Sequence, residues 1–225
     1  MADRRPDIPT GPPKGGSLRM VGVMGSVGLL ASAILVTTFQ VTAPFIEANR
    51  RAYLESAILD VIPNAVSFRS FEITDGTVVA ATEPSGLFAG FDSTGTLAGI
   101  AIESQGQGYA DVIRLLYGYS PACECIVGMK VLESKETPGL GDKIEKDATF
   151  QSNFDALQAK TDEADTSLLQ AIEMVKQGAK SNPWEIEAIT GATVSSRAVT
   201  RIIKESATSA VPLLRRNIDK LTEAD

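Results

Sequence analysis

Residues 20–46 read MVGVMGSVGLLASAILVTTFQVTAPFI and contain no charged side chain. A helix needs about 20 predominantly apolar residues to cross a hydrocarbon core of about 30 Å, so this stretch is long enough to span a membrane once. A cleavable signal peptide has a shorter apolar core and a small-residue cleavage site, for which Ser32–Ala33 and Thr42–Ala43 are candidates. The length of the run disfavours that interpretation and also a buried helix of a soluble protein. We therefore predict an uncleaved transmembrane helix over residues 20–46.

The charges on either side of this segment predict its orientation. Residues 1–19 carry four basic and two acidic side chains, whereas the whole chain has a formal net charge of -7. Only Arg50 and Arg51 follow the span closely. Because basic residues are retained in the cytoplasm, we expect a single-pass protein of the cell (inner) membrane with a periplasmic or otherwise extracytoplasmic C-terminal domain. The Pro/Gly-rich residues 9–16 predict that 1–19 is a disordered cytoplasmic tail.

The composition restricts the chemistry that the chain can perform. The sequence is 44% hydrophobic and 22% charged, which is typical of a folded protein, but it contains no histidine and two cysteines. Catalytic triads, Cys–His pairs and histidine-ligated metals are therefore excluded, and so is a cluster held by four thiolates of this chain. The acidic balance argues against a nucleic-acid partner. The chemistry must come from hydroxyls, carboxylates, backbone amides or a bound cofactor, and we predict neither a metal site nor catalytic residues.

Beyond the apolar segment, the pattern predicts a helix over residues 47–64 and then a domain over 65–225. The helix is expected to continue from the anchor and to end at Pro63–Asn64. A run of short β-like segments follows, with turns at Asp75–Gly76 and Ser93–Gly95. The fold class is therefore α+β, an antiparallel sheet with flanking helices. The segments are strands at 67–73, 77–82, 87–92, 97–104, 111–120 and 125–134, a helix or loop at 148–158, a helix or buried strand at 167–178, and a helix at 198–221 with Pro212 as an interruption or kink.

Hydroxyl side chains cluster in the stretch EAITGATVSSRAVTRII, Glu187–Ile203. One explanation is helix capping, in which Thr193, Ser195 or Ser196 accepts a hydrogen bond from a first-turn N–H, and this is the commoner use of such residues. The other is a phosphate site, because a helix N-terminus offers free N–H donors and Gly191 allows close approach of the backbone. Hydroxyls of Thr190, Ser195 and Ser196 would complete that second arrangement.

A second unusual stretch is ESKETPGLGDKI, Glu133–Ile144. Pro138, Gly139 and Gly141 predict a tight loop after a strand. The loop is either an ordinary connection or a place where something flat and large presses against the backbone, with Leu140 as the apolar contact.

Taken together, TGATVSS (Thr190–Ser196) and VLESKETPGLGDKI (Val131–Ile144) resemble the FMN-binding domain of membrane-bound redox complexes. The resemblance is to the G subunit of Rnf-type electron-transport complexes, with the C subunit of the sodium-translocating NADH:quinone reductase as a related family. It covers the whole chain: a short basic tail, one anchor, the segment GYADVIRLLYG (Gly108–Gly118), the ETPGLG loop, and the GAT motif before the last helix.

The resemblance implies a covalent flavin. In that family the FMN phosphate forms a phosphoester with the last threonine of the [ST]-G-A-T motif, here Thr193, through the action of a separate flavin transferase. An isolated threonine hydroxyl without an adjacent base is a poor nucleophile, which agrees with a separate enzyme. Many members carry an aspartate where this chain has Glu187. The resemblance implies that the cofactor-binding residues are Thr193 with Thr190, Gly191, Ala192, Ser195 and Ser196, and that Glu136, Thr137, Gly139, Leu140 and Gly141 lie by the isoalloxazine ring.

The function implied by the resemblance is electron transfer within a larger assembly. The chain would relay electrons through FMN in a complex that couples electron flow between ferredoxin and NAD to ion translocation. Its partners would be multi-span membrane subunits and other redox subunits, besides the lipid bilayer. The alternative is a membrane-anchored FMN-binding regulatory or sensory module. The resemblance assigns no role to Cys123 and Cys125, which could form a disulfide outside the cytoplasm but are interpreted as ordinary thiols in preference to a redox pair.

Overall fold

The computed structural model describes residues 16–74 and 76–222 and divides the chain into two compact units, one up to Arg51 and one from Ala52. Each unit is considered by itself. The first consists of the N-terminal part of α1, Gly16–Val61. This helix is long and apolar enough to cross a membrane, and side chains such as Leu29 and Leu35 are 74% and 70% exposed. Residues 16–19, expected in the tail, belong to α1; the tail's residues 1–15 lie outside the described residues.

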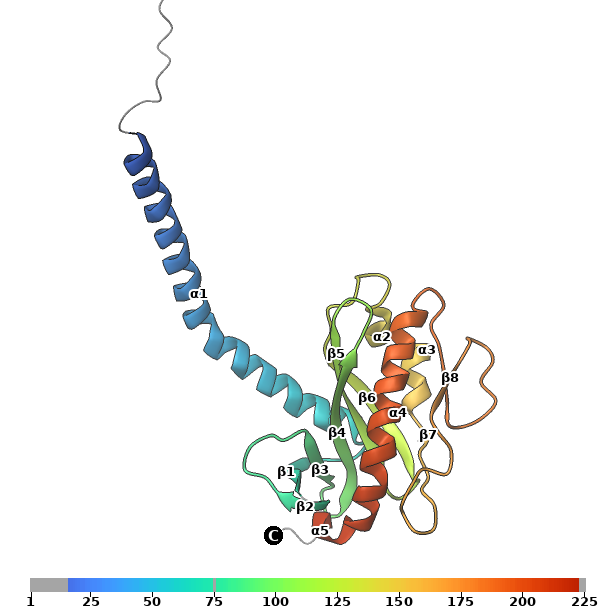
Figure 1. The fold of residues 1–225 in the computed structure, drawn as a ribbon. Helices are drawn as coiled ribbons and strands as arrows, with labels where there is room; N and C mark the ends of the chain where they lie inside the picture. The colour runs from blue at the N-terminus through green and yellow to red at the C-terminus, as the bar shows by residue number, and fades with distance from the viewer. Residues whose placement is uncertain (1–15, 75, 223–225) are drawn as a thin grey trace, which may run out of the picture. The chain divides into compact units, whose positions relative to one another are not determined.

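The second unit is built on a seven-stranded antiparallel sheet with the order β2-β1-β3-β4-β5-β6-β7 (Figure 1). The alternating and β-branched segments of the sequence form these strands, as predicted, and the α+β fold class is confirmed. The wholly buried β3 lies inside the sheet, whereas the shorter β2 and β7 form its edges. The strands are β1 Ser67–Thr74, β2 Thr77–Ala80, β3 Leu87–Phe91, β4 Leu97–Gln107, β5 Val112–Ser120, β6 Cys125–Glu133 and β7 Leu157–Gln158.

One face of the sheet is covered by the last turns of α1. Ile58, Val61 and Ile62 are at most 1% exposed and pack in a cluster with side chains of β3, β4 and β5. The close approach depends on Gly118, where a Cβ atom would lie 1.9 Å from the Val61 carbonyl oxygen. The second compact unit begins at Ala52, and the apolar side chains of this helix segment form part of its core.

The opposite face carries α4, Thr193–Arg216, which crosses β4 and β5 (Figure 1). Its first residue precedes the predicted helix start at 198, and the helix continues through Pro212 without a break. Burial of Val199, Ile203 and Leu214 against the sheet outweighs the local cost of the proline. The helix then ends at Arg216, and a separate short helix, α5 Ile218–Thr222, follows.

The segment between β6 and α4 is mostly irregular. Residues 148–158, expected as helix or loop, form a short helix, a 3₁₀ turn and β7, whereas 167–178 contains only a three-residue strand. That strand pairs in parallel with a second one in a separate sheet. The elements are α2 Lys143–Lys146, α3 Ala148–Gln151, η1 Ser152–Phe154, β8 Glu173–Val175 and β9 Glu185–Glu187.

Cys123 and Cys125 are joined by a disulfide in the turn between β5 and β6, so the expectation of two ordinary thiols is wrong. Glu124 lies between them with a φ of +54°, and its carboxylate contacts the guanidinium of Arg215 at 3.0 Å. The C-terminal end of α4 is thus fastened to this turn. Spacing alone could not distinguish a bonded pair from two thiols, because the local backbone conformation decides whether the sulfur atoms meet.

Candidate functional site

Glu136 ties together three segments that are distant in sequence. Its side chain is 6% exposed, and its Oε1 accepts hydrogen bonds from the backbone N–H groups of Tyr109 and Ala110 at 2.8 and 2.9 Å. The Ser195 hydroxyl donates to the other oxygen, Oε2. The turn between β4 and β5, the loop after β6 and the first turn of α4 therefore meet at one carboxyl group.

Two glycines leave the space that this carboxyl group needs. A Cβ atom on Gly141 would lie 2.5 Å from Glu136 Oε2 and 2.8 Å from Ser195 Oγ. A Cβ atom on Gly108 would lie 2.5 Å from Glu136 Oε1. Gly141 therefore makes room for Glu136, and the expectation that the glycines of the ETPGLG loop admit a flat ligand stays a prediction.

The hydroxyls around the GAT motif have different partners. Thr190 donates to Gln177 Oε1 at 2.6 Å, and Ser195 donates to Glu136. Ser196 accepts from the Ile189 N–H at 3.1 Å and donates to the Ala192 carbonyl at 3.0 Å. Thr193 is exposed, and its hydroxyl has no hydrogen-bond partner among the described residues.

The helix-capping interpretation of this cluster is wrong. The N-cap of α4 is Ala192, whose side chain cannot accept a hydrogen bond, and the structure assigns no side-chain cap to this helix. Ser196 receives its hydrogen bond from Ile189, which precedes the helix. The first-turn N–H groups are thus not occupied by the hydroxyls that the sequence offered for them.

One cavity, of about 380 Å³, lies between the ETPGLG loop and the start of α4. We call it the ring-side cavity. It brings together eight of the predicted site residues, whereas Gly139, Thr190 and Ser196 do not line it. Tyr109 and Val194, which sequence reasoning missed, line it together with Glu136, Thr137, Leu140, Gly141, Gly191, Ala192, Thr193 and Ser195.

The ring-side cavity exposes apolar groups to solvent. Tyr109 is 69% exposed, Leu140 52% and Val194 50%. Exposed apolar side chains gathered around one cavity are a feature of ligand sites. No local sequence signal separates Tyr109 or Val194 from residues of the core, and only the structure shows that they are exposed beside the cavity.

A second cavity, of about 590 Å³, lies on the other side of the GAT motif, and we call it the cationic cavity. It shares Gly191 and Thr193 with the ring-side cavity. Gly191 has a φ of +85°, and a Cβ atom there would meet nothing within 4 Å, so its backbone is open to a ligand. The cationic cavity is lined by Met174, Val175, Lys176, Gln177, Ala188, Ile189, Thr190, Gly191, Thr193 and Arg197.

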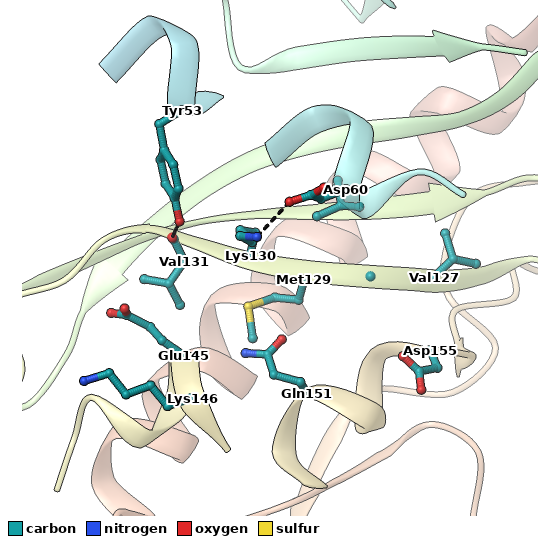
Figure 2. A pocket seen from close by; sticks show the side chains of 12 residues that line it. Tyr53, Asp60, Val127, Met129, Lys130, Val131, Glu145, Lys146, Gln151 and Asp155 are labelled. Carbon is teal, nitrogen blue, oxygen red and sulfur yellow. Dashed lines mark hydrogen bonds and ion pairs between the residues drawn. The ribbon is translucent and has the colours of Figure 1, made fainter. Parts of the chain in front are cut away.

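A third cavity, of about 550 Å³, lies along β6 and contains none of the predicted site residues (Figure 2). We call it the β6-edge cavity. Strand β7 pairs only with Cys125 and Ile126, so no strand of the described chain pairs with this edge from Val127 onward. The Tyr53 hydroxyl donates to the Val131 carbonyl at 3.0 Å, and Lys130 Nζ lies 2.7 Å from Asp60 Oδ2. This hydrogen bond to Asp60 raises the pKa of Lys130.

Comparison with known proteins places the chain in a family. Residues 108–208 match a family profile described as an FMN-binding domain. The G subunit of the ion-translocating oxidoreductase complex of Methanosarcina acetivorans is 30% identical over 182 residues, which span 80% of this chain and 87% of the relative. This chain belongs to that G-subunit family. Another relative, the G subunit of the Na⁺-translocating ferredoxin:NAD⁺ oxidoreductase complex of Acetobacterium woodii, is 30% identical over 181 residues, 77% of this chain and 82% of the relative.

Solved structures support the fold of this G-subunit family member. The crystal structure of NqrC from Shewanella oneidensis matches with a TM-score of 0.57 at 20% identity, over 79% of this chain and 100% of that one. The C subunit of the Na⁺-translocating NADH-quinone reductase of Parabacteroides distasonis matches with a TM-score of 0.52 at 16% identity, over 72% of this chain and 79% of that one. Membership of the G-subunit family, as predicted, is therefore confirmed, and the chain shares its fold with these two C subunits.

Proposed function

We propose that this G-subunit family member relays electrons through FMN that is esterified by its phosphate to Thr193. One observation carries the proposal. Of the hydroxyls around the GAT motif, only that of Thr193 is exposed and lacks a hydrogen-bond partner within the described chain, and it lies where two cavities meet. A hydroxyl that is to become an ester has to be both reachable and uncommitted, and none of the neighbouring hydroxyls meets both conditions.

The ring-side cavity fits an isoalloxazine ring. Its volume of about 380 Å³ falls within the usual range for ligand cavities, roughly 300–1,000 Å³. Leu140 and Val194 offer aliphatic surface, and Tyr109 offers an aromatic face that can stack on a planar ring. The exposed Thr137 adds a hydroxyl that can help to fix a ligand's orientation.

When bound, FMN supplies the capacity to take up and release electrons, and the protein's own residues fix its position. Attachment would form a bond between the Thr193 oxygen and the phosphorus of a flavin dinucleotide. The pyrophosphate bond of that donor would break, and a nucleoside monophosphate would leave. No described residue accepts a hydrogen bond from the Thr193 hydroxyl, so a separate flavin transferase would supply the base that takes its proton.

We further propose that the chain works inside an Rnf-type complex with multi-span membrane and redox partners. The names of the relatives support this, because the Acetobacterium woodii protein is a subunit of a Na⁺-translocating ferredoxin:NAD⁺ oxidoreductase complex. In such a complex this protein would pass electrons between cofactors of its neighbours. The exposed apolar α1 would serve as the anchor, with the flavin domain outside the cytoplasm as the flanking basic residues predict.

The attachment is tested by expressing the full chain beside a flavin transferase and examining flavin fluorescence on a denaturing gel. Thr193→Val keeps the shape of the side chain and removes the nucleophile, so its band should be dark. Thr208→Val, on the same helix, removes an exposed hydroxyl that donates to the Lys204 carbonyl and lines neither cavity; it is the matched control and should stay fluorescent. Fluorescence that survives in the Thr193→Val band would show that the flavin is attached elsewhere and would overturn the proposal.

A further inference from the structure

The two cavities that share Thr193 differ in their charge. The cationic cavity is lined by Lys176 and Arg197 and by no acidic side chain of the described chain. Among the described residues that line the ring-side cavity, only Glu136 is charged, and its buried carboxyl group already holds three hydrogen bonds. A ligand with an anionic end and a flat apolar end would therefore meet a different environment on each side of Thr193.

The two basic groups of the cationic cavity are uncommitted. Lys176 and Arg197 are exposed, and within the described chain neither side chain makes an ion pair or hydrogen bond. By contrast, Lys130, Lys135 and Lys146 each bond an aspartate. Arg197 follows Thr193 by four residues on α4, so the two side chains lie on the same face of the helix, one turn apart.

The segment at the end of β8, which also lines the cationic cavity, is fixed by hydrogen bonds within the chain. The hydrogen bond from Thr190 to Gln177 fixes the turn after β8 against the GAT motif, and the Ala188 N–H donates to the Val175 carbonyl at 2.9 Å. Lys176 lies in the chain between Val175 and Gln177, the two residues that accept these hydrogen bonds. Lys176 and Arg197, from different elements of the chain, both line the cationic cavity.

We propose that Arg197 and Lys176 are positioning residues that pair with the flavin phosphate, and that this pairing directs the isoalloxazine ring into the ring-side cavity. The inference rests on the proposed attachment to Thr193 and deepens it. Guanidinium and ammonium groups are the side chains that recognise phosphate, and Arg197 can do so with two parallel hydrogen bonds. A reversed arrangement would place the anionic phosphate beside Glu136 and the apolar ring between two cations.

The test separates binding from attachment by using the full-length Thr193→Val chain, which cannot form the ester. FMN and riboflavin, which differ by the phosphate, are titrated by quenching of flavin fluorescence. We expect FMN to bind at least about tenfold more tightly than riboflavin, a preference of about 1.4 kcal/mol, because only FMN carries the phosphate that the two basic groups can bond. Adding Arg197→Gln or Lys176→Gln should reduce this preference severalfold and leave riboflavin affinity unchanged, and Arg197→Lys should restore part of it.

Lys204→Gln is the matched control, because it removes a positive charge from the same helix but lines neither cavity. It should leave the FMN preference unchanged. A preference that survives in the Arg197→Gln, Lys176→Gln double variant would overturn the inference, and so would an equal loss in Lys204→Gln.

A second measurement uses the flavin-loaded chain with Thr193 intact. The phosphorus NMR resonance of the phosphoester should move in Arg197→Gln and stay in place in Lys204→Gln; identical spectra in all three chains contradict the pairing. If the wild-type chain carried no flavin on Thr193, the proposed attachment would be refuted. The role of Arg197 and Lys176 would still be tested, because the preference of the Thr193→Val chain for FMN over riboflavin does not depend on the ester.

Discussion

The β6-edge cavity is larger than the ring-side cavity, about 550 against 380 Å³, yet the two differ in how their polar groups are used. In the β6-edge cavity Tyr53 bonds the Val131 carbonyl and Lys130 bonds Asp60 (Figure 2). The other basic group that lines it, Lys146, bonds Asp142. At the other site, Thr193 and its cationic neighbours are left without partners in the described chain. The two sites therefore differ in whether their basic side chains are already paired, a difference that the cavity volumes do not show.

The origin of the β6-edge cavity is structural. A sheet edge presents unpaired backbone groups, and proteins protect such edges with covering helices, charged side chains and irregular pairing. Here α1 supplies Tyr53 and Asp60, and the pairing of β6 with β5 shifts register beside Gly118. The β6-edge cavity therefore forms because side chains of α1 cover this edge of β6 while no strand of the described chain pairs with it from Val127 onward.

The largest effect is expected from Glu136→Ala, which removes the carboxyl group that joins three segments of the ring-side cavity. Two backbone N–H groups and the Ser195 hydroxyl would lose their acceptor. Since each buried unsatisfied group costs about 1–3 kcal/mol, we expect the free energy of unfolding to fall by about 2–4 kcal/mol, with a marked loss of attached flavin. Thermal unfolding of the full chain in detergent and flavin fluorescence on a gel measure the two effects.

Glu136→Gln is the informative companion. Its amide oxygen can still accept from Tyr109 and Ala110, and its amide nitrogen can donate to the Ser195 oxygen. It should therefore keep most of the stability and most of the flavin. If Glu136→Gln lost as much stability and flavin as Glu136→Ala, the charge of Glu136 would be what matters, and its three hydrogen bonds would not be what joins the segments.

An intermediate effect is expected when a methyl group is added in each cavity. Gly141→Ala places a Cβ atom 2.5 Å from Glu136 Oε2, and Gly128→Ala in the β6-edge cavity places one 3.0 Å from the Val61 backbone. Overpacking of this kind typically costs about 1–3 kcal/mol, so both variants should be less stable than wild type. Only Gly141→Ala should also lose attached flavin. Equal flavin loss in both variants would remove the functional distinction between the two cavities.

The sequence predicted the sheet well because its strands carry their own signals. Alternation and β-branched residues mark the segments from Ser67 to Glu133, and nearly all of the hydrogen-bond partners are neighbours along the chain. The predictions failed where tertiary packing decides the outcome. Pro212 stays inside α4 because the helix is held against the sheet, and residues 167–178 are mostly irregular because β8 finds only the short β9 as a partner.

The two motifs predicted which segments form the site, but they did not predict which side chains bond one another within it. The motifs indicated Glu136 as a ring contact, which stays a prediction. They did not indicate that its carboxyl group, which lines the ring-side cavity, also joins three segments, because that role depends on Gly108 and on Ser195 far along the chain. Tyr109 and Val194 escaped because nothing in their local pattern separates them from core residues. Arg197 reads as an ordinary exposed helix residue until the cavity beside it is seen. Long-range contacts of this kind have no local sequence signal.

The smallest effect is expected from Lys130→Gln in the β6-edge cavity, and it should depend on pH. The hydrogen bond to Asp60 raises the pKa of Lys130 above its usual 10.5, so the ion pair's contribution is complete below that pH and is lost as the pH rises through the raised value. The side chains are 40% and 55% exposed, so the pair is worth about 0.2–1 kcal/mol.

The stability difference between wild type and Lys130→Gln should therefore be small at pH 7 and vanish in strong alkali, with no change in attached flavin. Burial raises the pKa of Tyr119 to about 12, so both chains lose stability as the pH rises from 10 through 12, and comparing them cancels that shared loss. Thermal unfolding across this pH range measures the difference. Loss of flavin in this variant would show that the β6-edge cavity serves the cofactor, and a difference that grows with pH would mean that Lys130 is not the paired ammonium group.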